Sequence, residues 1–536
     1  MTKLEIADIS TAAMLKRPIA AQPFRPVAAL TIASHPTAHR VGERLLLTAL
    51  GASKEVSVAR NEPDFVKPGR ALGIPLGDPF VSRKPIRFVP MGQGCIRLLS
   101  DHEGVVVGAR VQGALEIGPD ELATGVPIEL ADRVLLVLHQ ITLDGEHDAE
   151  LLGMVGHSDG IRRVRAHVER IVDLHVPVLI RGETGTGKEL VARAIHDRGP
   201  RKNGPFVSVN LGAVPRELAA AELFGAHKGA YTGATRDRDG FFRAARGGTL
   251  FLDEVGEAPP EVQVMLLRVL ETGEIYPVGA QVPIATDVRL IAATDANLEE
   301  QIREGRFKAP LLHRLAGYEI RLPALRERRE DIGVLFYHFA REELAAIGEA
   351  HRLSPEDPYA EPWLPASVAA KLVRFDWPGN IRQLRNLTRQ LVIGNRGRAQ
   401  ITLDPRMAEE LVAGAAKAPS PRRSDAEGDL NPQVVNAGGK ARRKPAEITE
   451  AEVLAALRED AWDLKAAADR LGIPRSSIYD VIDRCPGIRT AGNLSTEEIT
   501  RCFEACGGDL DEMVRRLEVS GRALKRRIKE LGLKRD

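Results

Sequence analysis

Cysteine is scarce in this sequence, with four residues in 536. No two of these cysteines have the paired spacing that zinc ligands show. The four are Cys95, Cys485, Cys502 and Cys506. Cys502 and Cys506 are four positions apart, which fits one face of a helix better than a metal site. We therefore expect reduced thiols and neither a disulfide framework nor a zinc centre.

Long apolar runs are also missing. No stretch approaches the ~20 apolar residues that a membrane-spanning helix needs, and the first residues lack the apolar core of a signal peptide. These absences predict a cytoplasmic protein with no membrane partner. An excess of one charge is missing too, because 75 Lys and Arg residues balance 74 Asp and Glu residues to a net charge of +1. Only the distribution of charge along the chain can therefore point to a partner.

A glycine-rich segment is the first feature that indicates chemistry. This glycine loop comprises Gly182, Glu183, Thr184, Gly185, Thr186, Gly187, Lys188 and Glu189. Residues 176–180 before it are apolar, as in a buried strand, and residues 190–195 after it have helical periodicity. In this order, backbone N–H groups of the loop surround the phosphates of a nucleotide and Lys188 reaches the terminal ones. Glu189 stands where Ser or Thr usually binds magnesium, so metal binding must use other groups.

A second strand, residues 249–252, ends in the two carboxylates of Asp253 and Glu254. An Asp-Glu pair after a strand is usually only a solvated loop. Beside a glycine loop, however, one carboxylate can bind hydrated Mg²⁺ and the other can polarise the attacking water. We therefore expect Asp253 to bind the metal and Glu254 to activate water for hydrolysis of ATP.

Four further segments accompany these motifs. They are Glu222–Gly225 (ELFG), Gly229–Ala234 (GAYTGA), Leu322–Arg328 (LPALRER) and Trp377–Leu384 (WPGNIRQL). Together the motifs of residues 150–412 resemble the bacterial enhancer-binding activators, which drive sigma-54 RNA polymerase with an AAA+ ATPase. The resemblance implies an α/β P-loop ATPase domain with a helical lid, ATP and Mg²⁺ as ligands, and self-association into a ring, expected to be a hexamer.

The resemblance also implies roles for single residues. Val155 and Gly156 match the segment that packs the adenine. Asn210 matches the residue that restrains the catalytic glutamate, and Thr294 lies where the family senses the γ-phosphate. Arg382 matches the arginine that reaches the nucleotide from the lid. The residue after Thr294 departs from the pattern, because Asp295 replaces the usual Asn and adds negative charge near phosphate.

The trans-acting arginines of the family match less well. Arg314 is present, but Lys308 fills the first arginine position, and lysine lacks the planar fork that suits a phosphoryl group. Pro310 is expected to bend this segment. We therefore predict Arg314 as the arginine that acts across the subunit boundary, with Lys308 as a weaker point charge. The alternative is that these residues form surface ion pairs only.

The hexapeptide indicates how the energy is used. In the family it caps a mobile loop that contacts the sigma factor. Its residues here are Gly229, Ala230, Tyr231, Thr232, Gly233 and Ala234. Tyr231 replaces the usual Phe, which keeps the aromatic ring and adds a hydroxyl. Without the surrounding motifs, the same residues would indicate a flexible surface turn.

The N-terminal part has an all-β pattern of short strands broken by Gly, Pro and Asp. Several pieces resemble a forkhead-associated (FHA) domain, a β-sandwich that binds phosphothreonine proteins, and Arg60 and Ser82 match its phosphate-contacting residues. Ala59, Pro85 and Glu103 depart from the FHA pattern, and a carboxylate at Glu103 is unfavourable beside phosphate. A sandwich used for dimerisation or protein contact remains the alternative.

After a linker rich in Ala, Pro, Gly and basic residues, the chain repeats itself with an offset of 46 residues. The first unit resembles the Fis-type helix-turn-helix, and the unit after it is similar to a duplicate, although a helical hairpin without a DNA role is the alternative. The candidate recognition helix of residues 475–484 has no net charge (2 − 2 = 0), whereas that of residues 521–530 carries +4 (5 − 1). We expect base contacts from the first helix and stronger phosphate binding from the second. The candidate DNA-binding residues are Arg475, Ser476, Ser477, Tyr479, Arg522, Lys525, Arg526 and Lys529.

The sequence thus predicts a multidomain protein: an all-β sandwich, an α/β AAA+ P-loop ATPase with a helical lid, and an all-α tandem helix-turn-helix. The expected boundaries are 1–26 (flexible N-terminus), 27–143 (FHA-like sandwich), 150–412 (ATPase), 413–446 (linker), 447–486 (helix-turn-helix) and 493–536 (its repeat). The predicted function is that of a sigma-54-dependent regulator that binds upstream DNA and uses ATP to remodel the closed promoter complex. The alternative is a DNA-binding regulator with weakened ATPase that acts by occupancy or scaffolding.

Overall fold

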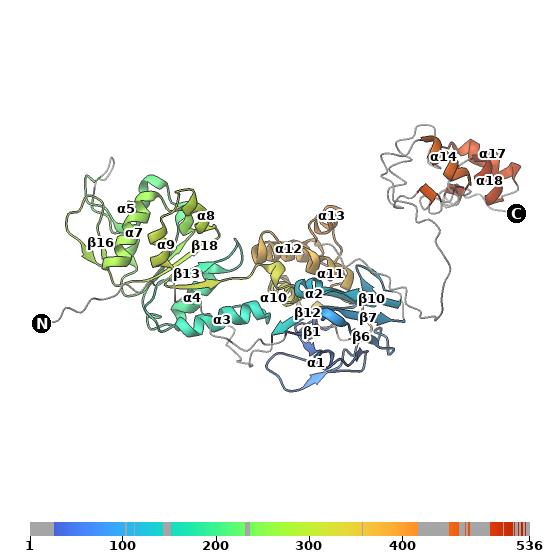
Figure 1. Cartoon of the computed structure of the whole chain (residues 1–536), viewed down its shortest axis with the longest axis horizontal. Coiled ribbons are helices and arrows are strands. Elements are labelled where there is room, and N and C mark those ends of the chain that lie inside the picture. Colours follow the sequence, from blue (N-terminus) through green and yellow to red (C-terminus); the bar gives the residue numbers. More distant parts are fainter. Residues whose placement is uncertain are drawn as a thin grey trace, which may run out of the picture. The chain divides into compact units, whose positions relative to one another are not determined.

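The computed structural model contains two compact units, residues 1–425 and 426–536 (Figure 1). Each is considered by itself. The structure describes residues 26–101, 104–111, 113–142, 152–230, 236–355, 357–415, 450–459, 494–506 and 509–517, together with isolated positions between 462 and 531. Among the helices of this described part, none is both long and apolar enough to cross a membrane.

Residues 26–142 form a β-sandwich of two antiparallel sheets. The larger sheet has the order β5-β4-β2-β1-β12-β11-β8-β9 and the smaller one β10-β7-β6-β3. The strands are β1 (Pro26–Ser34), β2 (Arg44–Leu46), β3 (Val56–Val58), β4 (Phe65–Val66), β5 (Gly73–Ile74), β6 (Ile86–Pro90), β7 (Ile96–Ser100), β8 (Val105–Val107), β9 (Ala109–Arg110), β10 (Gly113–Ile117), β11 (Val126–Leu130) and β12 (Val134–Thr142). Helices α1 (Thr48–Gly51) and α2 (Pro119–Thr124) are short connections.

The two sheets share one apolar core. Strands β6, β7 and β10 alternate buried and half-buried side chains, as period-two strands with one buried face do. Phe88 and Leu98 of the smaller sheet lie in the same buried cluster as Leu30 and Ile32 of β1. Strand β12 is buried on both faces over most of its length, which means that its second face is covered by something other than the smaller sheet.

The α/β subdomain, residues 152–321, surrounds a five-stranded parallel sheet with the order β14-β15-β18-β13-β19. Its strands are β13 (Val178–Arg181), β14 (Phe206–Asn210), β15 (Thr249–Asp253), β18 (Arg289–Thr294) and β19 (Tyr318–Arg321), and a small hairpin joins β16 (Glu274–Ile275) to β17 (Ile284–Ala285). Its helices are α3 (Asp159–Ile171), α4 (Lys188–Arg198), α5 (Arg216–Phe224), α6 (Phe241–Ala244), α7 (Pro260–Thr272), α8 (Leu298–Arg303) and α9 (Ala309–Leu315). Because the strands are parallel, the residues that follow β13, β14, β15 and β18 meet at one edge of the sheet.

The helical subdomain, residues 325–413, follows the last strand. It contains α10 (Glu330–Ala346), α11 (Ala366–Arg374), α12 (Asn380–Gly394) and α13 (Pro405–Ala413). Its core also takes in Ala33, Leu135 and Val137 of the β-sandwich. The second face of β12 is therefore covered by these helices, and Figure 1 shows α10 and α11 beside β1 and β12.

In the C-terminal unit, α14 (Glu450–Glu459), α17 (Thr496–Ala505) and α18 (Leu510–Leu517) contribute to one apolar cluster. Helices α14 and α17 each have 10 residues, and their first and last residues are 46 positions apart (496 − 450 and 505 − 459). Val453 of α14 and Ile499 of α17, which correspond in the predicted repeat, are both fully buried. The two candidate recognition helices fall largely outside the described residues.

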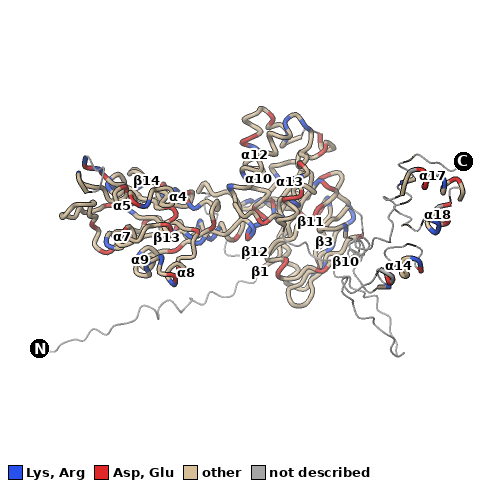
Figure 2. Tube along the Cα trace, turned by 90° about the horizontal axis from the view of Figure 1, so that it is seen from above, with Lys and Arg blue, Asp and Glu red and all other residues tan. Residues whose placement is uncertain are grey.

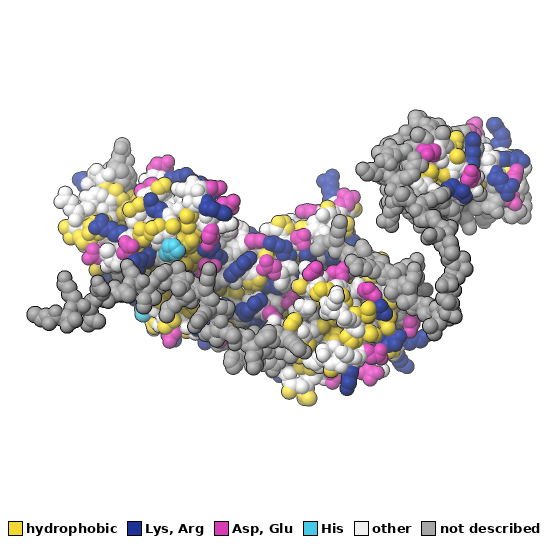
Figure 3. Space-filling view, viewed as in Figure 1, with side chains coloured by type: hydrophobic (Ala, Val, Ile, Leu, Met, Phe, Trp, Pro, Cys, Tyr) yellow, Lys and Arg dark blue, Asp and Glu magenta, His cyan; other side chains and the backbone are white. Residues whose placement is uncertain are grey.

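Charges of both signs are interspersed over unit 1 (Figure 2). Apolar side chains on the face seen in Figure 3 form small groups among them, over both the α/β subdomain and the β-sandwich. The near-zero net charge of the sequence thus reflects local mixing within this unit.

Candidate nucleotide site

The glycine loop connects β13 to α4, in the order that the sequence predicts. Gly185 and Gly187 have φ angles of 80° and 104°, a region that favours glycine. At Gly185 a Cβ would also overlap the carbonyl oxygen of Gly379. The Lys188 ammonium lies over the loop and donates to the carbonyl oxygen of Gly182 at 2.8 Å. Glu189 points away, because its carboxylate pairs with Arg193 at 3.1 Å.

The two predicted carboxylates lie at the tip of β15, beside the end of β14. Asn210 and Asp253 are partners across the two strands. An Asp253 oxygen accepts the N–H of Glu254 at 3.0 Å, and Glu254 has a left-handed φ of 55°. The Glu254 carboxylate rests against Gly212, where no Cβ could be placed. The Asn210 side-chain oxygen accepts from the N–H of Ala213 at 3.1 Å, so the carboxylates and this amide are fixed by local backbone bonds.

These groups line one cavity of about 630 Å³. Three sets of residues surround it: the glycine loop, the strand tips, and one face of α12 with Phe339 of α10. The lining residues are Thr184, Gly185, Gly187, Lys188, Glu189, Leu190, Asn210, Asp253, Glu254, Phe339, Ile381, Arg382, Arg385, Asn386 and Arg389. Cations from the loop and from the helical subdomain thus face two carboxylates, as expected where phosphate and a divalent metal meet.

A smaller, mostly apolar cavity of about 90 Å³ adjoins the first and shares Leu190, Phe339 and Ile381 with it. Met154 and Val155 line it on one side, and Leu335 and His338 of α10 on the other. Val155 is therefore placed as the sequence predicts. Gly156 does not line the cavity; its φ is 123°, and a Cβ there would lie 2.5 Å from a carboxylate oxygen of Asp331.

A network that the sequence did not reveal ties the glycine loop to the helical subdomain. Arg326 donates two hydrogen bonds to Glu183, at 2.9 and 2.5 Å. Asn380, fully buried, donates to Glu183 and to the carbonyl of Thr184, both at 3.1 Å, and accepts from the N–H of Leu325 at 2.8 Å. The Arg326 hydrogen bond is the main cause that lowers the pKa of Glu183 to about 2. All three residues belong to the segments that carry the resemblance, but their spacing gave no sign of mutual contact.

The two sensor positions lie at different depths. Thr294, at the end of β18, is buried, and its hydroxyl accepts the N–H of Ala296 at 3.0 Å. Asp295 accepts a 2.5 Å hydrogen bond from the hydroxyl of Thr184. The departure from Asn thus places a carboxylate directly against the glycine loop.

The segment with the candidate trans-acting residues differs from the prediction in one respect. Pro310 lies in the first turn of α9, where its missing N–H costs nothing, and so it begins a helix and does not bend the segment. Lys308 precedes this helix, and its N–H donates to Gln263 at 2.9 Å. The Arg314 side chain is 58% exposed and lies 3.7 Å from Glu271. Among the described residues, neither Lys308 nor Arg314 lines the cavity of its own chain.

Only the base of the predicted sigma-contact loop is described. Ala226 and Arg238 exchange two backbone hydrogen bonds, at 3.0 and 2.8 Å, which brings the two arms of the loop together. Gly229 and Ala230 continue one arm, and Tyr231, Thr232, Gly233 and Ala234 lie outside the described residues.

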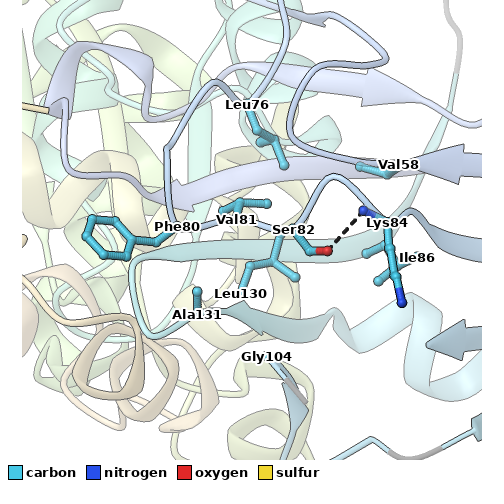
Figure 4. A pocket seen from close by; sticks show the side chains of 10 residues that line it. All are labelled: Val58, Leu76, Phe80, Val81, Ser82, Lys84, Ile86, Gly104, Leu130 and Ala131. Atoms are coloured by element: carbon cyan, nitrogen blue, oxygen red, sulfur yellow. Dashed lines mark hydrogen bonds between the residues drawn. The ribbon is translucent and has the colours of Figure 1, made fainter. Parts of the chain in front are cut away.

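The residues that match the FHA pattern lie at one end of the sandwich. Arg60 donates to the carbonyl of Pro79 at 2.6 Å, and the Ser82 hydroxyl accepts the N–H of Lys84 at 3.0 Å. Ser82 and Lys84 border a cavity of about 220 Å³ whose other walls are mostly apolar, from Val58 to Leu130 (Figure 4). Arg60 is not part of that lining, and Glu103 lies outside the described residues.

The C-terminal candidates cannot be placed. Arg475, Ser476, Ser477, Tyr479, Arg522, Lys525, Arg526 and Lys529 lie outside the described residues. The sulfurs of Cys502 and Cys506 are 3.8 Å apart on α17, and burial is the main cause that raises the pKa of Cys502 to about 11.

Comparison with known proteins assigns the central region. The sigma-54 interaction domain matches residues 154–321, and the AAA+ ATPase lid domain matches residues 326–423. The regulator NtrC of Azospirillum brasilense is 48% identical over 247 residues, which cover 46% of this chain and 49% of the relative. NtrC of Rhizobium meliloti (strain 1021) is 38% identical over 345 residues, which cover 61% of this chain and 68% of the relative.

The chain therefore spans about half of the first relative's length and about two thirds of the second's. A solved structure of NtrX from Brucella abortus in complex with ATP is 29% identical, covers 71% of this chain and 70% of that chain, and has a TM-score of 0.43. The match to the sigma-54 interaction domain coincides with the α/β subdomain, and the lid match includes the helical subdomain. The chain thus belongs to the sigma-54-dependent transcriptional regulators, whose ATPase is of the AAA+ type.

Proposed function

We propose that this chain hydrolyses ATP to remodel a closed sigma-54 RNA polymerase promoter complex, while it is bound to upstream DNA and assembled as a ring. One observation carries the proposal: the glycine loop, the carboxylates of Asp253 and Glu254, and Arg382 line a single cavity. An apolar cavity of a size suited to part of a base adjoins it. Phosphates and base of one nucleotide could thus be bound side by side.

Each lining group has a distinct role in this proposal. Lys188 and the loop N–H groups bind the phosphates, and Arg382 adds charge from the helical subdomain. Asp253 holds Mg²⁺, since that ion is bound through one or two carboxylates and substrate phosphates; when bound, it neutralises charge on the phosphates. Glu254 orients and polarises the attacking water, and Asn210, on the neighbouring strand, restrains Glu254.

Hydrolysis in this proposal requires a neighbouring subunit. Arg314 is more than half exposed and lies outside its own cavity, as an arginine must if it acts on the nucleotide of another copy. Such a residue stabilises the charge of phosphoryl transfer, and it couples turnover to ring assembly. Lys308 supplies at most a single hydrated charge at the same boundary.

The energy of hydrolysis reaches the sigma factor through Tyr231 and Thr232. The support is the closed base of the loop, because the paired arms at Ala226 and Arg238 would pass a movement of the subdomain to the tip. The C-terminal unit supplies DNA binding through two helix-turn-helix units. Support comes from the equal lengths and 46-residue offset of α14 and α17. The β-sandwich is proposed to be FHA-like, with Arg60 and Ser82 as the residues that would contact a phosphothreonine partner.

The first test separates binding, chemistry and coupling. Lys188→Ala should abolish ATP binding, whereas Glu254→Ala should bind ATP and lose turnover. Thr232→Ala should retain ATPase activity but fail to form open complexes with sigma-54 polymerase, because the loop transmits work and performs no chemistry. Unchanged hydrolysis by Glu254→Ala would remove that residue from the mechanism, and normal open complexes with Thr232→Ala would remove the loop.

A second candidate function is a DNA-bound regulator whose ATPase has weakened. The specific observation in its favour is that Asp295 places a carboxylate against the glycine loop through Thr184. Turnover of the full chain decides between the two functions. ATP-independent regulation with negligible hydrolysis would support the second, and Asp295→Asn should then raise turnover.

A further inference from the structure

The β-sandwich packs against the helix that closes the apolar cavity of the candidate nucleotide site. Leu335 and His338 of α10 line that cavity. On the sandwich side of the same helix, a Cβ at Gly333 would overlap the carbonyl oxygen of Ala33, so β1 and α10 touch backbone to backbone. Two turns of α10 therefore have the nucleotide cavity on one side and the sandwich on the other.

A sandwich side chain also reaches the backbone of the nucleotide site. Arg44 of β2 donates from Nη2 to the carbonyl oxygen of His157 at 3.2 Å, and from Nε to the hydroxyl of Thr31 at 3.3 Å. His157 follows Val155 by two residues, and Val155 lines the apolar cavity. One hydrogen bond thus connects the sandwich with the segment that would contact the base.

That segment, residues 154–158, is held by two further groups. Asp331 of α10 accepts from the N–H of His157 at 2.6 Å and from the N–H of Ser158 at 3.1 Å. Arg165 of α3 donates to the carbonyl oxygen of Gly156 at 2.7 Å. The backbone of residues 156–158 is therefore fixed from α3, from α10 and, through Arg44, from the sandwich.

The environment of Arg44 makes this geometry costly to change. Burial is the main cause that lowers the pKa of Arg44, and Glu330 and Asp331 oppose the shift. His139 of β12 continues the buried group: its ring lies 2.8 Å from the Thr31 hydroxyl and 3.8 Å from a Glu330 oxygen. A buried cation that loses its partners is strongly destabilising, so Arg44 has little freedom to leave this position.

We infer that the β-sandwich is an integral part of the nucleotide site, with Arg44 as a positioning residue that fixes residues 154–158 where the base binds. The inference rests on the proposed nucleotide site and adds a specific dependence to it. Arg44 touches no part of the nucleotide and acts through the carbonyl of His157. By linkage, a ligand of the sandwich that shifts Arg44 changes nucleotide affinity, and nucleotide changes that ligand's affinity by the same factor.

The test compares ATP with inorganic tripolyphosphate, which lacks the base, by calorimetry on the full chain. Arg44→Ala should weaken ATP binding about tenfold, the effect of one lost hydrogen bond at ~1.4 kcal/mol, while tripolyphosphate binding stays within about twofold. It should raise KM for ATP and leave kcat unchanged, and Arg44→Lys should recover part of the loss. The matched control is Arg97→Ala on the smaller sheet, which removes the 2.7 Å pair with Glu116 and should change neither ligand.

A second pair of variants tests the helix contact without removing a charge. Gly333→Ala should weaken ATP binding in the same selective way, because the added methyl forces β1 away from α10. The control, Gly394→Ala in α12, has open space around the added methyl and should bind normally. Parental ATP affinity in both Arg44→Ala and Gly333→Ala overturns the inference, as does an equal loss of ATP and tripolyphosphate. A parent chain that binds neither ligand would overturn the proposed function itself.

Discussion

At the scale of single residues, Asn380 shows how one side chain can join two parts of a site. Its amide uses both ends: the oxygen accepts from Leu325, and the nitrogen donates to Glu183 and Thr184. Its φ of 51° is a conformation that Asn tolerates better than most residues. Leu325 and Glu183 are far apart in sequence, so the fully buried amide links the helical subdomain to the glycine loop.

We expect Asn380→Ala to lower the free energy of unfolding by about 2–4 kcal/mol, because it strands the buried N–H of Leu325 and strains the backbone. Asn380→Gly deletes the same hydrogen bonds without the positive-φ penalty. It should therefore be less destabilising, by about 1 kcal/mol. Denaturant titration of the full chain measures both. Equal stability of the two variants would show that strain at this position is negligible.

The trans-acting residues give a second prediction at this scale. Arg314→Ala should reduce turnover by ~10³-fold or more, the usual contribution of an arginine finger, and Lys308→Ala should reduce it less. Lys308→Arg should raise turnover, since a planar fork replaces a hydrated point charge. Turnover is measured at saturating ATP and at protein concentrations above those needed for assembly. A larger loss in Lys308→Ala than in Arg314→Ala would reverse these roles.

At the scale of elements, α10 decides the arrangement of unit 1. A carboxylate in the first turn of a helix normally gains about 0.3–1 kcal/mol from the helix dipole, and Glu330 is in that turn. Burial between the helix and the sandwich outweighs this gain, because transferring a charge from water costs several kcal/mol. Burial, followed by the charge of Asp331, raises the pKa of Glu330 to about 8.

This shift predicts how stability changes with pH. The folded pKa of Glu330 lies above its ordinary value of 4.5, so its contribution to stability is full below pH 4.5 and is lost as pH rises to about 8. Arg44 faces Glu330 and favours its charged form, whereas Asp331 and Asp159 oppose it. Glu330→Gln should therefore be more stable than the parent at pH 8.5, relative to their difference at pH 5. Parallel pH profiles of the unfolding free energy would contradict the burial argument.

At the scale of the whole molecule, function depends on how charge and hydrophobic surface are distributed. The net charge of +1 conceals a local excess, because residues 521–530 carry +4 while residues 475–484 carry none. Phosphate neutralisation dominates DNA affinity, and each contact released contributes about one unit to the slope of log K against log salt. The two C-terminal units should therefore have different roles.

Replacing Arg522, Lys525 and Arg526 with Ala should weaken DNA binding for all sequences and reduce the salt slope by about three units. Replacing Arg475, Ser476 and Tyr479 should change sequence preference with a smaller effect on the slope. Titrations on specific and scrambled DNA at several salt concentrations measure both quantities. If the first-unit variant loses more of the slope, the second unit is a protein-contact module.

The sequence by itself determined the local chemistry of this protein. The glycine loop, the carboxylates after β15 and the apolar run of β13 are contiguous segments, and their function follows from residue order and strand direction. Pro310 shows the limit even there: proline ends or begins a helix according to its position in the first turn, and the bend predicted for it was wrong.

Only the tertiary structure decided which distant segments complete the site. Glu183, Arg326 and Asn380 meet because α12 and the segment before α10 fold over the glycine loop. Arg44 meets His157 because the second face of the larger sheet packs on α10 and α11. Neither contact has a period or spacing in the sequence. Each depends on which buried faces cover one another, and that is fixed by the packing of the whole unit.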